Sequence, residues 1–285
     1  MAFVARVALI SEVSSVSLSD VVVVSAALQK QVSRDFSPIW DIDATVDPFA
    51  RLEDVPLGYW PIIIVDDVPN AAGVHLDSQG QPFALVEAGE SWSLTASHEC
   101  LEMLADPFGD QLVAGKSVKR GQGRVEYLVE VCDPSEAEGF AYTVNDILVS
   151  DFYTLHFFDP KKALGVQYSF GGEITRPRQV LPGGYLSWHD PVSDHWWQLT
   201  WFSGNRPTFR DLGIFSASDP RSIREIVDSM TPQTRRLSNL QRKNKMLLSA
   251  RASLKESNVS SNRKAKAWRE QIKALKKYSK NEKGK

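Results

Sequence analysis

Apolar positions in the first part of the chain alternate or recur at spacings that distinguish strands from helices. Residues 4–10 alternate as a strand, and residues 21–32 are apolar at helical spacing behind the capping residues 17–20. Residues 39–46 alternate again, and residues 59–65 form a continuous apolar run, as in strands that are buried on both faces. The pattern predicts a strand, a helix and two further strands, in that order.

A hairpin and a long helix are predicted next. Residues 75–77 and 82–87 flank the turn-forming residues 78–81, so we expect the two arms to pair, with the second arm at a sheet edge. Residues 91–105 are expected to form a helix, because serines stand at its start and Pro107 cannot continue it. A mixed sheet packed against this long helix follows from the order of elements.

The second half of the chain is predicted to be rich in strands, which gives an α+β fold class. Residues 124–131 suit a strand, and residues 140–145 and 148–152 suit another hairpin. Residues 185–202 contain four tryptophans around a turn-forming segment, residues 190–194. These rings favour a hairpin that packs on the body of the protein over a stacking platform for a sugar or a base.

Charge divides the chain near residue 220. Residues 221–285 contain 19 Lys and Arg against 5 Asp and Glu, a net charge of +14, whereas residues 1–220 contain 14 against 30, a net charge of −16. We expect three parts, namely a metal-binding domain of residues 1–160, an aromatic-rich β extension of residues 161–220 and a basic helical tail of residues 221–285.

The basic tail suggests an acidic partner. Leucines at heptad spacing indicate a short coiled-coil or docking helix, and they are Leu237, Leu240, Leu247 and Leu254. A second helix would place Trp268, Ile272 and Leu275 on one face among many lysines. The tail would therefore bind a polyanion such as nucleic acid, contact anionic lipid, or fold back on the acidic body.

The sequence indicates a cytoplasmic protein. No stretch approaches the roughly 18 apolar residues that a membrane helix needs, and the first residues lack the basic start and the cleavage site of a signal peptide. The two cysteines, Cys100 and Cys132, are too few for a disulfide framework, and Cys100 is expected to be a small buried thiol.

The predicted helix contains a pattern of metal ligands. His98 and Glu102 are four residues apart, so they project from one face, about 6 Å apart along the axis, and can share an ion. Glu99 lies about 100° around the helix, where it can serve as general base towards a metal-bound water. A carboxylate ligand at Glu102 weakens the pull of the ion on this water and favours harder ions than zinc.

Zinc-type sites need a third protein ligand. Glu130 and Asp133 are the favoured candidates, because they lie at the end of a predicted strand that can return beside the helix. The one that is not a ligand would orient His98 through its second ring nitrogen. Asp106 would reach the ion only if the helix unwinds before Pro107. The other options are three further histidines, which are His156, His189 and His195.

The string from His98 to Glu102 resembles the His-Glu-x-x-His helix of the zincin metallopeptidases, with a glutamate as the last residue. The resemblance covers residues 1–160 and implies a zincin-like mixed sheet, an edge strand before the motif helix, and zinc as cofactor. It also makes Glu130 or Asp133 similar to the later glutamate of one zincin branch. The longer pattern His-Glu-x-x-Glu-Met-Leu-x-Asp-Pro is similar to that of uncharacterised bacterial and viral proteins, which implies no established activity.

Two functions follow as hypotheses. The first is a metal-dependent hydrolase, a peptidase acting on a protein or peptide, in which Glu99 moves the proton and Tyr142 or Tyr153 supports the oxyanion. The second is a non-catalytic structural or nucleic-acid-associated binding protein with a vestigial or structural metal site. The carboxylate of Glu102 in place of a histidine is what separates them.

Overall fold

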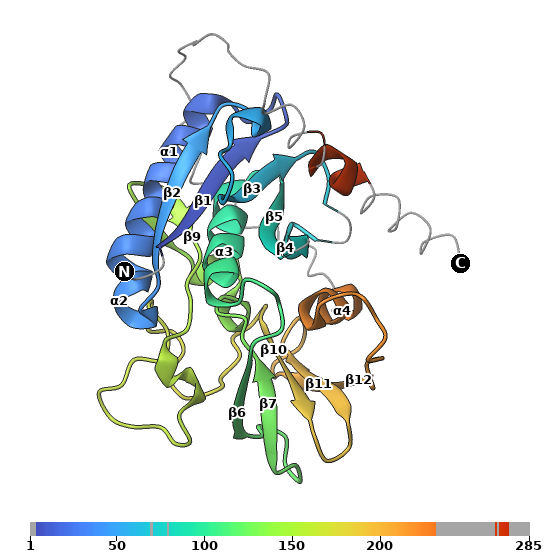
Figure 1. The fold of residues 1–285 in the computed structure, drawn as a ribbon. Coiled ribbons are helices and arrows are strands. Elements are labelled where there is room, and N and C mark those ends of the chain that lie inside the picture. The colour runs from blue at the N-terminus through green and yellow to red at the C-terminus, as the bar shows by residue number, and fades with distance from the viewer. Residues whose placement is uncertain (1–3, 69–70, 79, 232–265, 267, 274–285) are drawn as a thin grey trace.

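The fold is known from a computed structural model, which describes residues 4–68, 71–78, 80–231, 266 and 268–273. The described residues form an α+β protein, as expected, with two five-stranded sheets and one short hairpin (Figure 1). No helix among them is both long and apolar enough to cross a membrane.

The first sheet is mixed and has the strand order β2-β1-β3-β5-β4. Its strands are β1 (Val4–Ser11), β2 (Asp43–Phe49), β3 (Trp60–Val65), β4 (Gly73–Ser78) and β5 (Gln81–Glu87). The first four in this order are parallel, and β4 runs antiparallel to β5 at the edge. The expected edge position of the second hairpin arm was therefore wrong: β4 is the edge strand, and β5 pairs on both sides.

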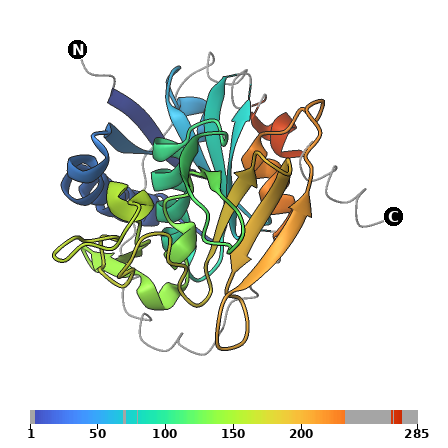
Figure 2. The ribbon, with the colours of Figure 1, turned by 90° about the horizontal axis from the view of Figure 1, so that it is seen from below.

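Two helices cover one face of this sheet. Helix α1 (Leu18–Lys30) begins at Ser17, whose side chain forms a capping box with Asp20. Helix α3 (Trp92–Ala105) packs against β4 and β5. Figure 2 shows α3 in the middle of the molecule, between the blue α1 and the orange strands of the second sheet. The motif helix is thus enclosed by the two sheets and α1.

The C-terminal helical segment covers part of the other face. Because side chains alternate along a strand, Leu9 of β1 faces the helices whereas Ile10 joins a cluster with Trp268 and Ile272. The ring of Trp268 lies 4.7 Å from that of Phe83, centroid to centroid. Figure 1 shows this segment in red beside β3 and β5. One of the interactions expected for the tail, folding back on the body, is therefore seen for this segment. The leucines at heptad spacing lie outside the described residues.

The second sheet is antiparallel, with the order β12-β11-β10-β7-β6. Its strands are β6 (Leu112–Lys116), β7 (Arg124–Leu128), β10 (Tyr185–Asp190), β11 (His195–Thr200) and β12 (Thr208–Gly213). Trp188 of β10 pairs with Trp197 of β11 and is fully buried, as the packing interpretation predicts. Because β10 pairs with β7, this sheet contains strands from both sides of residue 160, where a domain boundary was expected.

Short elements complete the fold. The hairpin of β8 (Tyr142–Val144) and β9 (Ile147–Val149) is the one predicted for residues 140–152. The remaining helices are η2 (Leu52–Asp54), η3 (Asp133–Ser135), η4 (Glu138–Phe140), η5 (Leu155–Phe158) and α4 (Ile223–Met230).

The strand predicted for residues 39–46 was wrong in its first half. Helix α1 continues through a π-helical stretch, η1 (Gln31–Phe36), and α2 (Ser37–Trp40) before the chain turns at Asp41, whose φ is +54°. The ring of Trp40 stacks on that of Phe36, and its indole nitrogen donates to the carbonyl of Tyr153. These contacts fix a helical turn where the sequence alternates, and the strand starts only at Asp43.

Candidate metal centre

Helix α3 presents His98 and Glu102 on one face. The Nε2 atom of His98 lies 3.2 Å from Oε2 of Glu102, as side chains one helical turn apart can do. Glu102 is fully buried, while the side chain of His98 keeps 13% of its surface exposed. His98 is therefore the member of the pair that solvent can reach.

Asp133 meets His98 from the opposite side. It begins η3, a few residues after β7, and its Oδ1 lies 3.3 Å from Nε2 of His98. Both of its carboxylate oxygens are buried, and neither forms a hydrogen bond within the described part of the chain. The backbone directly before β10 packs against this turn: a Cβ on Gly184 would lie 2.5 Å from the carbonyl oxygen of Asp133. The position of Asp133 is thus fixed by the second sheet.

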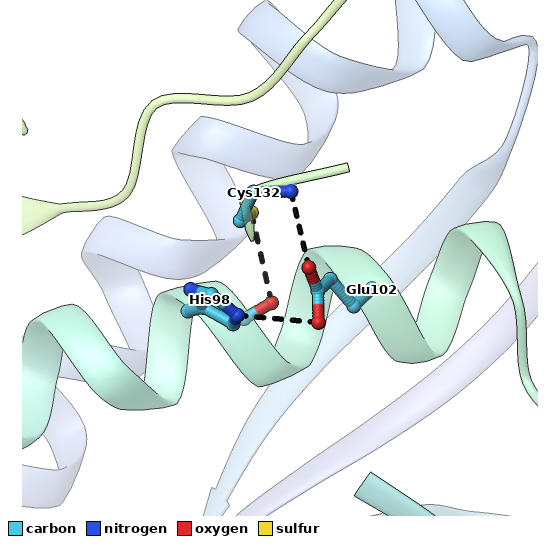
Figure 3. Close-up of side chains that lie close together, drawn as sticks. All are labelled: His98, Glu102 and Cys132. Atoms are coloured by element: carbon cyan, nitrogen blue, oxygen red, sulfur yellow. Dashed lines mark hydrogen bonds and ion pairs between the residues drawn. The ribbon is translucent and has the colours of Figure 1, made fainter. Parts of the chain in front are cut away.

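Glu102 is oriented by the backbone of Cys132. The amide of Cys132 donates to Oε1 of Glu102 at 3.1 Å, which leaves Oε2 free to face His98 (Figure 3). The thiol of Cys132 lies 3.8 Å from the carbonyl oxygen of His98. Burial raises the pKa of this thiol well above its usual value, and its sulfur lies within 4.8 Å of ligand atoms of His98 and Glu102. Both cysteines are buried and free.

Arg224 enters the cluster from α4. Its guanidinium donates to Oε2 of Glu102 at 2.5 Å and also to Glu130, and its Nε donates to Asp228 at 3.1 Å. The amide of Arg224 is held by the carbonyl of Gly109, where a Cβ would lie 2.9 Å from the Cβ of Arg224. A residue from the start of the expected tail is therefore built into the buried centre.

Acidic groups dominate the electrostatics of the cluster. Burial raises the pKa of Glu102, but Arg224 and His98 outweigh it and hold this pKa well below the usual range. Burial lowers the pKa of His98, but the carboxylates of Glu102 and Asp133 outweigh it and raise this pKa well above its ordinary value.

Two neighbouring acids have raised pKa values. Burial and the neighbouring Glu102 raise the pKa of Asp133 well above its ordinary value, and burial raises that of Glu136 to about 8. A cation bound beside these two carboxylates would favour their charged forms.

Glu99 occupies the neighbouring face of α3. Its Oε2 is buried, 3.7 Å from Nδ1 of His75 on β4 and 3.6 Å from Nη2 of Arg224. Strand β4 comes close enough for this contact because residue 73 is glycine: a Cβ there would lie 2.7 Å from Oε1 of Glu99. A carboxylate oxygen of Glu99 also lies within 4.8 Å of the Glu102 carboxylate. Glu99 is therefore close to both Glu102 and His75.

Two separations around His98 match those between neighbouring ligand atoms of a zinc site. Zinc binds imidazole nitrogen and carboxylate oxygen at about 2.0–2.2 Å, which separates neighbouring ligand atoms by about 3.4 Å in a tetrahedron. The separations of 3.2 Å and 3.3 Å from His98 to Glu102 and Asp133 are close to this value. Ligand atoms of Glu102, Glu130 and Asp133 also lie within 4.8 Å of one another. The structure therefore gathers the four residues predicted as ligands, although Glu130 also binds Arg224.

Asp106 does not take part in this group. Its two carboxylate oxygens accept hydrogen bonds from the amides of Gly109 and Gln111, which stabilise the turn after α3. The other candidate histidines pair with acids elsewhere: His156 with Asp159, His189 with Glu126 and Asp194, and His195 with Asp211.

The two candidate tyrosines differ in position. The hydroxyl of Tyr142 donates to Asp35 at 3.0 Å, away from the centre. The hydroxyl of Tyr153 is buried, lacks a hydrogen-bond partner among the described residues, and has a pKa raised by burial and by the charge of Glu102. Tyr153 is therefore the donor that stands near the acidic cluster.

Sequence reasoning missed four polar residues of the centre, which are His75, Glu136, Arg224 and Asp228. His75 could have been found from the sequence, because it is one of only 5 histidines and lies in the hairpin predicted directly before the motif helix. Arg224 carried no local signal, because it stands among the basic residues that follow position 220.

Comparisons of the chain with protein-family models, with curated proteins and with solved structures find no match.

Proposed function

We propose that the His98 cluster binds one divalent cation, zinc, and that the protein is a hydrolase that cleaves peptide bonds. His98, Glu102 and Asp133 are the proposed ligands, with Glu130 as a neighbouring acid. The observation that carries the proposal is that Nε2 of His98 lies 3.2 Å from Glu102 and 3.3 Å from Asp133, whose two buried carboxylate oxygens have no hydrogen-bond partner among the described residues.

The chemistry requires a Lewis acid and a proton carrier. The cation would supply the first, because it polarises a carbonyl oxygen and lowers the pKa of water. Glu99 would supply the second, because its buried Oε2 stands beside Glu102 and can take a proton from the attacking water and pass it to the leaving amine. The unpaired hydroxyl of Tyr153 would donate to the oxygen that becomes negative.

Two structural features support the resemblance to zincins on which the choice of peptide bonds rests. The motif lies on a long helix against a mixed sheet, and an antiparallel edge strand, β4, precedes that helix. Substrate would approach past His98, which is the exposed member of the ligand group.

A second candidate function is a non-catalytic protein whose acidic centre is structural. One observation favours it: the guanidinium of Arg224 already pairs with Glu102 and Glu130. In that case the cluster would be a buried ion-pair network that fastens α4 to α3. The basic region after residue 220 would then serve to bind a polyanion such as nucleic acid.

We further propose a cytoplasmic location, which two free buried cysteines support because they suit a reducing compartment.

Elemental analysis of the full chain tests the metal proposal. After loading with zinc and gel filtration, we expect one zinc per wild-type chain, and loss of zinc in His98→Gln and Asp133→Asn. His156→Gln is the matched control, since His156 is an exposed histidine paired with Asp159 outside the cluster. A wild-type chain without zinc would overturn the metal proposal and favour the ion-pair alternative.

Cleavage of dye-labelled casein tests the catalytic role. We expect Glu99→Gln to keep its zinc and to lose cleavage by a factor of about 100 or more, which is the contribution of a general base. If this variant cleaves casein as fast as the wild type, the role assigned to Glu99 is wrong.

A further inference from the structure

A second group of potential metal ligands lies on the other side of Glu102. Ligand atoms of His75, Glu99 and Glu102 fall within 4.8 Å of one another, and all three residues are buried. His75 is 1% exposed, Glu99 is 3% exposed and Glu102 is 0% exposed. This group shares Glu102 with the His98 cluster, so the two positions would form a pair joined by one carboxylate.

The ring of His75 is oriented as in a metal ligand. Its Nε2 lies 2.9 Å from the carbonyl oxygen of Asp106, which can only accept, so Nε2 carries the proton. Metal-binding histidines commonly donate their second nitrogen to a backbone carbonyl in this way. Nδ1 faces Glu99 Oε2 at 3.7 Å, and both atoms lack a hydrogen-bond partner among the described residues. A buried ring nitrogen and a carboxylate oxygen that face each other in this way are donor atoms that one divalent cation can bind together.

Arg224 places a positive charge at this position. Its Nη2 lies 3.6 Å from Oε2 of Glu99, and its Nη1 lies 2.5 Å from Oε2 of Glu102. The guanidinium neutralises charge, but it forms no hydrogen bond with Nδ1 of His75. It therefore takes the place of a cation at the two glutamates and leaves the histidine of the group unused.

We propose that His75, Glu99 and Glu102 form a latent second site for a divalent cation, which the guanidinium of Arg224 closes in the wild-type protein. Arg224 acts as a built-in second cation, and it limits the centre to one metal ion. The count of one ion in the wild type rests on the proposed function, whereas the latent site depends only on the residues around His75.

The closing residue is positioned by the backbone. The amide of Arg224 donates to the carbonyl of Gly109, and the capping box of Ser222 and Glu225 begins α4 directly before it. Arg224 also pairs with Asp228 one turn later on the same helix. Removing the charge of Arg224 frees the carboxylate oxygens of Glu99 and Glu102 for another cation.

The test is the zinc content of Arg224→Met in the full chain, measured by elemental analysis after gel filtration. We expect two zinc ions per chain, against one in the wild type, because methionine matches the apolar stem of arginine and lacks the charged guanidinium group. Arg224→Lys is the matched control and should stay at one, since its ammonium preserves the positive charge. Adding His75→Gln to Arg224→Met should return the count to one.

The outcomes separate this inference from the proposed function. One zinc in both wild type and Arg224→Met overturns the latent site and leaves the first site standing. No zinc in the wild type overturns the proposed function, while a gain of one in Arg224→Met that depends on His75 still supports the latent site.

If Arg224→Met does not fold, Arg224→Gln, which also removes the charge, is measured in its place. One zinc ion more than in the wild type, lost again on adding His75→Gln, supports the latent site, and a count equal to that of the wild type overturns it.

Discussion

Replacing Glu102 by glutamine tests how much the buried ion pairs stabilise the metal-free protein. Glu102 is fully buried and accepts from Cys132 through one oxygen, while the other oxygen faces His98 and Arg224. Glutamine can still accept from Cys132. Its NH₂ group would then face two donors, so the variant loses the attraction and adds a donor–donor contact.

The expected loss follows from what remains around Arg224. Breaking a buried pair costs about 3–5 kcal/mol, and the low end applies because Arg224 keeps Glu130 and Asp228. A loss of about 3 kcal/mol lowers Tm by roughly 6–12 °C in a protein of this size.

Thermal unfolding at pH 7 with a chelator, followed by circular dichroism, measures this difference. Glu173→Gln, a change at an exposed glutamate outside any helix or strand, is the control and should melt like the wild type. The pKa of Glu102 is lowered in the folded state, so its contribution is complete above the unfolded pKa of about 4.3 and disappears as the pH falls further. A Tm for Glu102→Gln within about 2 °C of the wild type at pH 7 would refute the reasoning.

Two further predictions concern surfaces away from the centre. Trp268→Ala removes a ring that is 5% exposed and packs on Phe83, so trypsin should cleave the C-terminal segment at least about 10-fold faster, since detaching it becomes easier by more than about 1.4 kcal/mol; an unchanged rate would contradict the docking. Burial lowers the pKa of His189, but hydrogen bonds to Glu126 and Asp194 outweigh it and raise this pKa above 6.5. The pairs therefore stabilise the fold below the unfolded pKa of about 6.5, by less than about 1 kcal/mol because both acidic partners are exposed, and the gain is lost as the pH rises through the raised pKa. Melting curves of wild type and His189→Gln should converge at high pH, and a constant difference would contradict the assignment.

The sequence predicts best where local chemistry determines the structure. Ser17 and Asp20 form the capping box that starts α1, and the apolar run before residue 65 is the buried strand β3. The four-residue spacing of His98 and Glu102 places both on one face because helix geometry alone requires it. These features depend on residues within one or two turns of each other.

Contacts between distant parts of the chain were not predictable in this way. Arg224 lies 122 positions after Glu102, and its charge is indistinguishable in sequence from those of the basic region around it. Strands β6 and β12 were missed because each has a single buried residue, Gly115 in β6 and Leu212 in β12, so neither has an apolar run. The helical turn at Trp40 replaced a predicted strand because its ring packs on Tyr153, far along the chain, as well as on the nearby Phe36.

The opposite charges of the body and the C-terminal region are partly satisfied within the molecule. Arg224 pairs with buried acids, and Arg269 pairs with Glu12 and Glu53 on the surface of the body. Salt screens the exposed Arg269 pairs strongly and the buried Arg224 pairs weakly. A polyanion would therefore compete with the body for Arg269 at the surface, whereas the buried charge of Arg224 stays inaccessible to it. The two basic residues thus differ in accessibility, although both lie in the same positively charged region of the sequence.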